Sequence, residues 1–181
     1  LHVGAGTFMP VKANRMDGHE MHMEWMDVSL ETVEAIRDHE GSILAVGTTS
    51  LRTIESLYWM GVKAHLNKHA TNLSIGQWEA YSQELTEHSL SKKDALHALA
   101  SWMHQHSQTH LFTQTQIIIA PGYQCKIATI LVTNFHQPKS TLLLLVSAAI
   151  GDDWKRCYTY ALENEFRFLS YGDGSLLFVN K

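Results

Sequence analysis

Hydrophobic residues recur along the first third of the chain at spacings that predict alternating helices and strands. Apolar residues at every third position follow Ser29, a residue type that favours helix N-termini, so we expect a helix over residues 30–39. The apolar run 42–46 predicts a short buried strand, and helical spacing resumes from Leu51. This part of the sequence therefore predicts the order helix, strand, helix.

The character of the sequence changes between residues 61 and 109, where His, Asn, Gln and Ser are frequent. One amphipathic helix is expected in this stretch, because Ser91 and Asp94 form a capping pattern ahead of apolar residues at helical spacing. We interpret residues 61–109 as a helical excursion from the main fold.

The last part of the chain returns to alternation between strands and helices. Strands are expected at 116–120 and 125–132, helices from Thr141 and Asp153, and a strand, a turn and a strand over 166–179. Together with the first third, this order predicts an α/β fold with a mixed, largely buried sheet and flanking helices.

Composition agrees with a folded globular chain. The 181 residues are enough for one well-buried domain, and 45% hydrophobic against 18% charged residues excludes a disordered tail, a collagen-like fibre and a coiled-coil rod. The sequence opens at Leu1 directly in a strand-like stretch, which leads us to expect a piece of a longer protein.

Charge and cysteine content limit the partners and the compartment. The formal net charge is −4, so a polyanion such as RNA must meet a local basic patch. Two cysteines without a Cys-x-x-Cys spacing are typical of a reducing compartment. The most apolar run is about half of the roughly 20 residues that cross a bilayer, so we expect a cytoplasmic protein without membrane insertion.

Thr48, Thr49 and Ser50 lie between a predicted strand and a predicted helix. Free N–H groups and the positive end of the helix dipole favour an anion there, and Arg52 in the next positions would strengthen it. The alternative is that Thr or Ser simply caps the helix. The turn lacks the lysine of a Walker loop, and the glycines in residues 4–6 lack the third glycine of a dinucleotide fingerprint, so neither nucleotide site is expected.

A second candidate site lies at His19, His22 and Glu24. These donor types fit either a metal ion or an acid/base pair in which the carboxylate orients an imidazole. On a strand, His19 and His22 point to opposite faces, which argues against both binding one ion.

A third candidate site follows the strand predicted at 125–132. Thr133, Asn134 and His136 lie at its carboxyl end, where open α/β sheets place their ligand crevices. The alternative is that the first two residues only satisfy backbone groups in a turn. Asp173 presents the same choice between a working carboxylate and turn chemistry.

Six segments, in order, carry a resemblance to one known family. They are residues 1–8, 19–24, 45–52, 121–123, 133–142 and 166–173, and they include the sequences GTTSLR, TNFHQPKSTL and FRFLSYGD. In this order they resemble the S-adenosylmethionine:tRNA ribosyltransferase-isomerases of queuosine biosynthesis. The resemblance covers residues 1 to about 60 and about 110 to 181.

The resemblance implies a place for this chain within a larger fold. Proteins of that family are longer and have an α/β domain interrupted by a small β-barrel. Residues 1–181 resemble the C-terminal part of the catalytic α/β domain, with the barrel absent and with an excursion at about 61–109 that is longer than the family usually carries.

The resemblance also implies a reaction. The ribosyl part of S-adenosylmethionine, used as co-substrate, is transferred to 7-aminomethyl-7-deazaguanine in a tRNA anticodon loop and isomerised, which gives epoxyqueuosine and releases adenine and methionine. No metal is implied, because the sulfonium acidifies its neighbouring carbons and serves as its own leaving group. A base and groups that protonate the departing adenine are needed.

The motifs assign provisional roles to individual residues. His22 with Glu24 is expected as an oriented base, with His136 and Asp173 as further proton-handling groups. Lys139 and Arg167 are expected to contact tRNA, and Tyr123, Phe135 or Tyr171 to stack on an extruded base. The residues expected to bind substrate are Gly4, Gly6, Thr7, Thr48, Thr49, Ser50, Arg52, Tyr123, Thr133, Asn134 and Tyr171.

Two other functions remain open at this point. A metal-dependent hydrolase would use His19, His22 and Glu24, and a non-catalytic binding module would use the same pockets without turnover. We expect the 181 residues alone to be monomeric and inactive.

Overall fold

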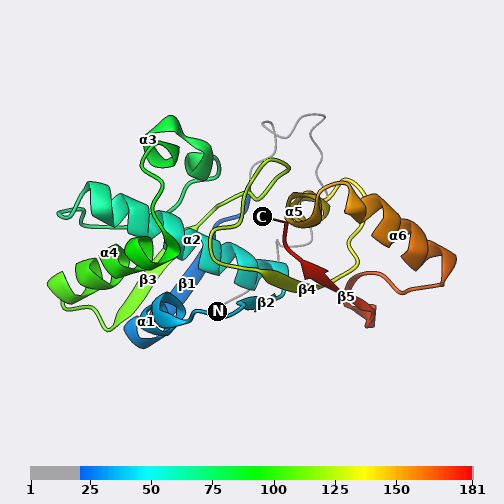
Figure 1. Cartoon of the computed structure of the whole chain (residues 1–181), viewed down its shortest axis with the longest axis horizontal. Coiled ribbons are helices and arrows are strands. Elements are labelled where there is room, and N and C mark those ends of the chain that lie inside the picture. Colours follow the sequence, from blue (N-terminus) through cyan, green and yellow to red (C-terminus); the bar gives the residue numbers. More distant parts are fainter. Residues whose placement is uncertain (1–20, 181) are drawn as a thin grey trace.

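The computed structural model describes residues 21–180, which form helices around two small sheets (Figure 1). This confirms the mixed α/β class. The elements in chain order are β1 Glu24–Ser29, α1 Leu30–Asp38, β2 Leu44–Val46, α2 Thr48–Leu66, η3 Glu79–Tyr81, α3 Gln83–Thr86, α4 Lys92–Gln105, β3 His110–Thr115, β4 Ile130–Asn134, α5 Thr141–Ile150, α6 Asp153–Glu163, η4 Leu169–Tyr171 and β5 Gly174–Phe178.

One sheet has three strands in the order β2-β4-β5. β2 runs parallel to β4, and β5 runs antiparallel to it. The register places Ala45, Leu131 and Leu177 side by side, and all three are buried. The alternate positions on the edge strands, such as Val46 and Phe178, are exposed. Only one face of this sheet therefore packs on the core within the described residues.

The other sheet is the antiparallel pair β1-β3. Its residues alternate between buried and exposed, with Met26 and Leu111 facing inward and Trp25 stacked on Phe112 outside. The same alternation places the carboxylate of Glu24 on the buried face, because Glu24 is two residues before Met26.

Helix α2 crosses the middle of the molecule and packs closely on α4 (Figure 1). The close approach depends on Gly61, since a Cβ atom added there would overlap the carbonyl group of Ala95. Helices α4 and α6 lie at opposite ends of the long axis in Figure 1. The N-terminal end of α2 therefore lies beside the three-stranded sheet, and its C-terminal end packs on α4.

Several predicted elements are confirmed at their starts. Ser29 caps α1 by accepting a hydrogen bond from the N–H of Thr32, and Ser91 caps α4 in the same way from Asp94. The predicted helices at Thr141 and near Asp153 are also present.

Four sequence expectations differ from the structure. The strand expected at 125–132 is observed as β4 at Ile130–Asn134, because residues 126–128 donate their N–H groups to Glu55 instead of to a neighbouring strand. Residues 116–120 contain buried apolar side chains but form no strand, and the N–H groups of Gln116 and Ile118 donate to the carbonyls of Ile75 and Gln77. Residues 166–169 likewise form no strand and lead into a 3-10 turn. The predicted boundary at residue 61 falls inside α2, which continues to Leu66 because its buried face continues through Val62 and Ala64.

Candidate functional site

The carboxyl ends of the parallel strands β2 and β4 meet at one edge of the sheet. The N–H of Gly47 donates to the carbonyl oxygen of Val132 over 2.8 Å, which fixes the start of α2 beside the end of β4. Gly47 adopts a φ of 89°, a conformation that favours glycine. The residues after β4 and those at the start of α2 therefore share one edge, as open α/β sheets lead one to expect.

Helix α2 begins without a side-chain cap. Its N-cap residue is Gly47, which has no side chain to offer, so Thr48, Thr49 and Ser50 lie inside the helix rather than capping it. Their hydroxyl groups make no hydrogen bond within residues 21–180. This excludes side-chain capping as the role of these residues, and it leaves the first N–H groups of the helix able to bind an anion.

A buried ion pair lies one turn further along α2. The Nη1 atom of Arg52 is 2.9 Å from the Oε1 atom of Glu24, and the Nε atom of Arg52 donates to the carbonyl of Ile117 over 2.9 Å. The two residues are only 3% and 5% exposed. Burial lowers the pKa of Arg52, and the neighbouring carboxylate of Glu24 opposes that effect.

Each partner in this ion pair has one polar atom left over. The Nη2 atom of Arg52 and the Oε2 atom of Glu24 are buried and have no hydrogen-bond partner among residues 21–180. Unpaired buried atoms of charged groups are costly, and they are rare outside functional sites. The pair thus holds one strong donor and one strong acceptor that are not satisfied by residues 21–180.

The expected pairing of His22 with Glu24 is wrong. Glu24 faces inward and binds Arg52, whereas His22 precedes β1 and is exposed. The physical reason is that His22 lies before β1 begins, so the strand alternation that buries Glu24 with Met26 does not extend to it. The hydrolase interpretation at His19, His22 and Glu24 stays a prediction, because His19 lies outside the described residues.

His136 lies in the loop after β4 and is 5% exposed. Its Nε2 atom is 2.8 Å from the hydroxyl of Thr133, while its Nδ1 atom is buried and has no partner in the part of the chain that the structure describes. Burial lowers the pKa of His136 to about 4, so the imidazole is neutral at physiological pH. When Nε2–H donates to Thr133, the free Nδ1 atom carries a lone pair that can accept a proton.

The loop before β5 joins the same edge of the sheet. The side-chain amide of Asn134 donates to the carbonyl of Asp173 over 3.2 Å, and the carboxylate of Asp173 accepts from the backbone N–H of Arg167 over 2.6 Å and from its Nε atom over 3.0 Å. These bonds lower the pKa of Asp173. Asp173 is therefore ionised and paired with Arg167, and its expected role as a proton-handling group stays a prediction. Tyr171 and Lys139 are exposed.

Tyr123 does not lie where a nucleobase could stack on it. It is 6% exposed, and its hydroxyl accepts from the indole of Trp59 and donates to Glu55 over 2.8 Å. Burial raises the pKa of Tyr123 well above its ordinary value. The expected stacking role is wrong for this residue, because both faces of its ring are inside the protein.

Glu55 is the structural residue that the sequence reasoning missed. Its fully buried carboxylate accepts hydrogen bonds from the Tyr123 hydroxyl and from the backbone N–H groups of Lys126, Ile127 and Ala128. An acidic residue three positions after Arg52 in an otherwise apolar helix was the available signal. It fixes the loop that leads into β4.

Some expected site residues fall outside the described part of the chain, namely Gly4, Gly6, Thr7 and His19. Within residues 21–180, no three His, Cys, Asp or Glu side chains gather closely enough to hold a metal ion. In the same range no helix has the length and apolar character needed to span a membrane.

Comparison with known proteins agrees with this arrangement. A family model described as "Queuosine biosynthesis protein" matches residues 1–177. The S-adenosylmethionine:tRNA ribosyltransferase-isomerases of Chelativorans sp. and Bradyrhizobium diazoefficiens are 40% and 38% identical to the chain over 182 residues. Each alignment covers 98% of this chain and 38% of the relative, so the chain spans about two fifths of the length of these relatives.

A solved structure supports the same relationship. The S-adenosylmethionine tRNA ribosyltransferase from Thermotoga maritima matches with a TM-score of 0.53 and 28% sequence identity, over 84% of this chain and 39% of that chain. The resemblance seen in the six sequence motifs is thus confirmed. The expectation that it skips residues 61–109 is wrong, because the family model matches 1–177 and the relatives align with 98% of the chain over 182 residues. The chain belongs to the queuosine biosynthesis protein family.

Proposed function

We propose that this chain supplies the S-adenosylmethionine site and part of the tRNA site of a tRNA ribosyltransferase-isomerase. In the proposed reaction the ribosyl moiety of S-adenosylmethionine is transferred to the aminomethyl nitrogen of 7-aminomethyl-7-deazaguanine in a tRNA anticodon loop. Adenine and methionine leave, and epoxyqueuosine forms in the tRNA. The relatives named for this activity support the proposal, since they match 98% of the chain.

The observation that carries the proposal is the unsatisfied pair of atoms at Glu24 and Arg52. The methionyl end of S-adenosylmethionine bears one carboxylate and one ammonium group. The free Nη2 atom of Arg52 matches the carboxylate, and the free Oε2 atom of Glu24 matches the ammonium group. Both protein groups are already held by their mutual 2.9 Å contact, so little side-chain entropy is lost on binding.

The neighbouring residues fit the rest of the substrates. The free N–H groups at Thr48 and Thr49 suit an anionic group of either substrate. The exposed Tyr171 is able to stack on an extruded base, and the exposed Lys139 is able to contact a phosphate. The positive charge of Arg167 is shared with Asp173, so it contributes less to RNA binding than its type suggests.

The proposed base is His136, acting at its Nδ1 atom. It is neutral and has no competing partner at that atom, so it is able to take the proton that the attacking amine or a carbon beside the sulfonium loses. His22, which the sequence motif assigned to this role, is exposed and remains the second candidate base.

Release of adenine tests the reaction. The full-length protein is incubated with S-adenosylmethionine and tRNA that carries the aminomethyl precursor, and adenine is measured. We expect adenine release from the full-length protein and none from the 181 residues alone. His136→Gln should lower kcat at least 100-fold and His22→Gln less than threefold, in line with the usual contribution of a general base. Absence of adenine at saturating substrates would contradict the proposed reaction.

Binding of S-adenosylmethionine tests the site separately from the chemistry. Arg52→Lys keeps the charge but removes the free Nη2 donor, and we expect about 10- to 100-fold weaker binding, the usual effect of losing a charged hydrogen bond. Arg37→Lys is the matched control, since Arg37 pairs with Asp38 on the surface of α1. Glu24→Gln should weaken S-adenosylmethionine but not an analogue without the α-amino group. Equal affinity of Arg52→Lys and Arg37→Lys would exclude this site.

A further inference from the structure

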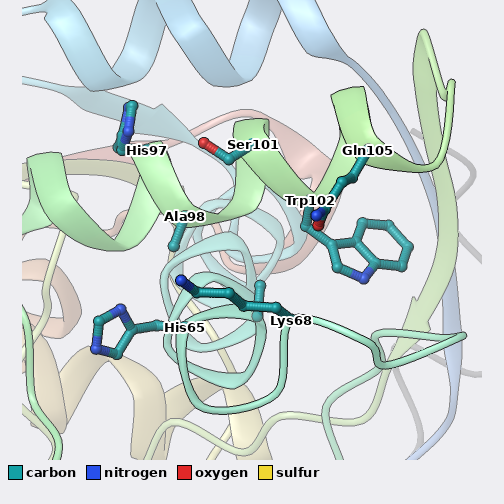
Figure 2. A pocket seen from close by; sticks show the side chains of 8 residues that line it. His65, Lys68, His97, Ala98, Ser101, Trp102 and Gln105 are labelled. Carbon is teal, nitrogen blue, oxygen red and sulfur yellow. The ribbon is translucent and has the colours of Figure 1, made fainter.

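A cavity of about 410 Å³ lies at the other end of α2, far from the site described above. It opens between the last turn of α2, the turn that follows it, and the outer face of α4 (Figure 2). Its lining comes entirely from the 61–109 segment. The lining residues are Ala64, His65, Lys68, His97, Ala98, Ser101, Trp102 and Gln105.

The polar lining of this cavity is basic. His65 and Lys68 come from the end of α2 and the turn after it, His97 comes from α4, and no lining residue is acidic. Figure 2 shows the Lys68 side chain between the turn and α4, on the same side of the helix as Ala98. A chain of net charge −4 thus concentrates three basic side chains in one hollow.

These three basic groups are not used by the fold. His65, Lys68 and His97 are exposed, and none of them makes a hydrogen bond or an ion pair with the described residues. The carbonyl of Lys63 near the end of α2 is already satisfied by the N–H of Asn67, so the helix end does not depend on them. The positive charge of Lys68 and the ring nitrogens of His65 and His97 are therefore available to a ligand.

The walls of the cavity are fixed. Trp102 is buried, and its indole N–H donates to the carbonyl of Ala70 over 2.8 Å, which ties α4 to the turn after α2. Gly61 sets the short distance between the two helices. Ser101 and Gln105 add polar groups on the same helix face that have no partner within residues 21–180. A hollow with fixed walls, an exposed lysine and several hydrogen-bonding side chains suits phosphate groups.

We propose that this cavity binds phosphate groups of the tRNA backbone, outside the anticodon nucleotide that reacts. The inference rests on the proposed function, since it assumes the same RNA partner. Ala64 is 16 residues after Thr48, which corresponds to roughly 24 Å along the helix at about 1.5 Å per residue. One folded RNA hairpin is able to reach both ends of α2, so the cavity would add affinity without touching the reacting base.

The test compares Lys68→Ala with Lys155→Ala in the full-length protein. Lys155 is an exposed lysine of α6, and α6 lies at the opposite end of the molecule (Figure 1). Both variants therefore lose one positive charge, but only one of them loses it at the cavity. The dissociation constant for tRNA is measured between 0.05 and 0.2 M salt. One lost phosphate contact lowers the slope of log affinity against log salt by about 0.9. At low salt, Lys68→Ala should therefore bind tRNA more weakly than the wild type. Between 0.05 and 0.2 M salt, its tRNA affinity should fall by a factor about three- to fourfold smaller than that of the wild type.

Two further measurements separate the possible outcomes. In Lys68→Ala, the affinity for S-adenosylmethionine and the kcat should equal those of the wild type, and only the KM for tRNA should rise. Inorganic phosphate at about 10 mM should not weaken tRNA binding by the wild type as the variant does, because the site recognises a polyanion. If wild-type protein binds tRNA and releases adenine while Lys68→Ala and Lys155→Ala behave alike, this inference is overturned and the proposed function stands. If the wild type does not bind tRNA, both are overturned. Tight binding of inorganic phosphate alone would overturn the assignment to RNA.

Discussion

The two ends of α2 present their polar groups in opposite ways. At the first end, Arg52 and Glu24 are buried, fixed by each other, and left with one unpaired atom each. At the last end, His65, Lys68 and His97 are exposed and have no partners within the described residues. Fixed, buried groups suit a small molecule of defined shape, whereas an exposed lysine beside two exposed imidazoles suits a polyanion. The helix thus joins two kinds of recognition.

The largest expected effect is at the buried end. Arg52→Met leaves the Glu24 carboxylate buried without its cation, which should lower the free energy of unfolding by about 3–5 kcal/mol. Adding Glu24→Leu removes the stranded charge, so the double variant should recover most of this loss and still fail to bind S-adenosylmethionine. Urea unfolding and calorimetric titration measure the two quantities.

The matched control for this prediction lies toward the other end of α2. Lys63 pairs with Glu79 in a partly exposed ion pair, so Lys63→Met should cost only about 1 kcal/mol. Equal losses in the free energy of unfolding for Arg52→Met and Lys63→Met would show that the buried ion pair is no more costly to break than the partly exposed one.

The second prediction breaks the last end of the helix. Gly61→Ala introduces a methyl group against the Ala95 carbonyl, and overpacking of this kind should cost about 3 kcal/mol. The α2–α4 distance must also increase, which widens the cavity and should weaken tRNA binding while leaving S-adenosylmethionine affinity unchanged. Gly76→Ala is the control, because its added Cβ would meet Glu79 only at ordinary contact distances, and it should show neither effect.

These contrasts explain what the sequence predicts and what it does not. The helix starts at Ser29 and Ser91 follow from local capping chemistry, and the structure confirms both. The partner of Glu24 could not be found in this way. It depends on which face of β1 the pairing with β3 buries, and on contacts that span 28 residues to Arg52 and 65 more to Ile117. The motifs locate residues near the sheet edge, but they do not say which groups those residues bind.

The third prediction sharpens the contrast by pH. An unfolded histidine titrates near pH 6.5, whereas burial lowers the pKa of His136 in the folded protein to about 4. Between these values the unfolded chain binds a proton that the folded protein does not, so the free energy of unfolding falls as the pH is lowered from 6.5 to 4. The loss should be on the order of 2 kcal/mol, given about 1.4 kcal/mol per unit of pKa difference and partial relaxation of the site.

The comparison variant for the pH experiment is His136→Gln, which should remove this slope. His97→Gln, at the exposed end, controls for the loss of one imidazole. Urea unfolding of the three proteins at intervals between pH 4.5 and 7.5 (a range set by roughly the two pKa values above) gives the curves. A constant difference between wild type and His136→Gln over this range would show that His136 is not held neutral by burial.

The smallest expected effect concerns the start of α4, which forms one wall of the basic cavity. Ser91 accepts a hydrogen bond from the N–H of Asp94 and donates to its carboxylate, so Ser91→Ala should cost about 1 kcal/mol. The loss should appear mainly as faster hydrogen exchange in the first turn of α4. His97 of the cavity lies in the same helix, less than two turns after Ser91. Fraying of the first turn should therefore disturb the cavity wall and weaken tRNA binding slightly. Ser29→Ala removes an equivalent cap from α1, which lines neither site, and should cost similar stability without changing either affinity. A change in S-adenosylmethionine affinity in Ser91→Ala would show that the two ends of α2 are coupled rather than independent.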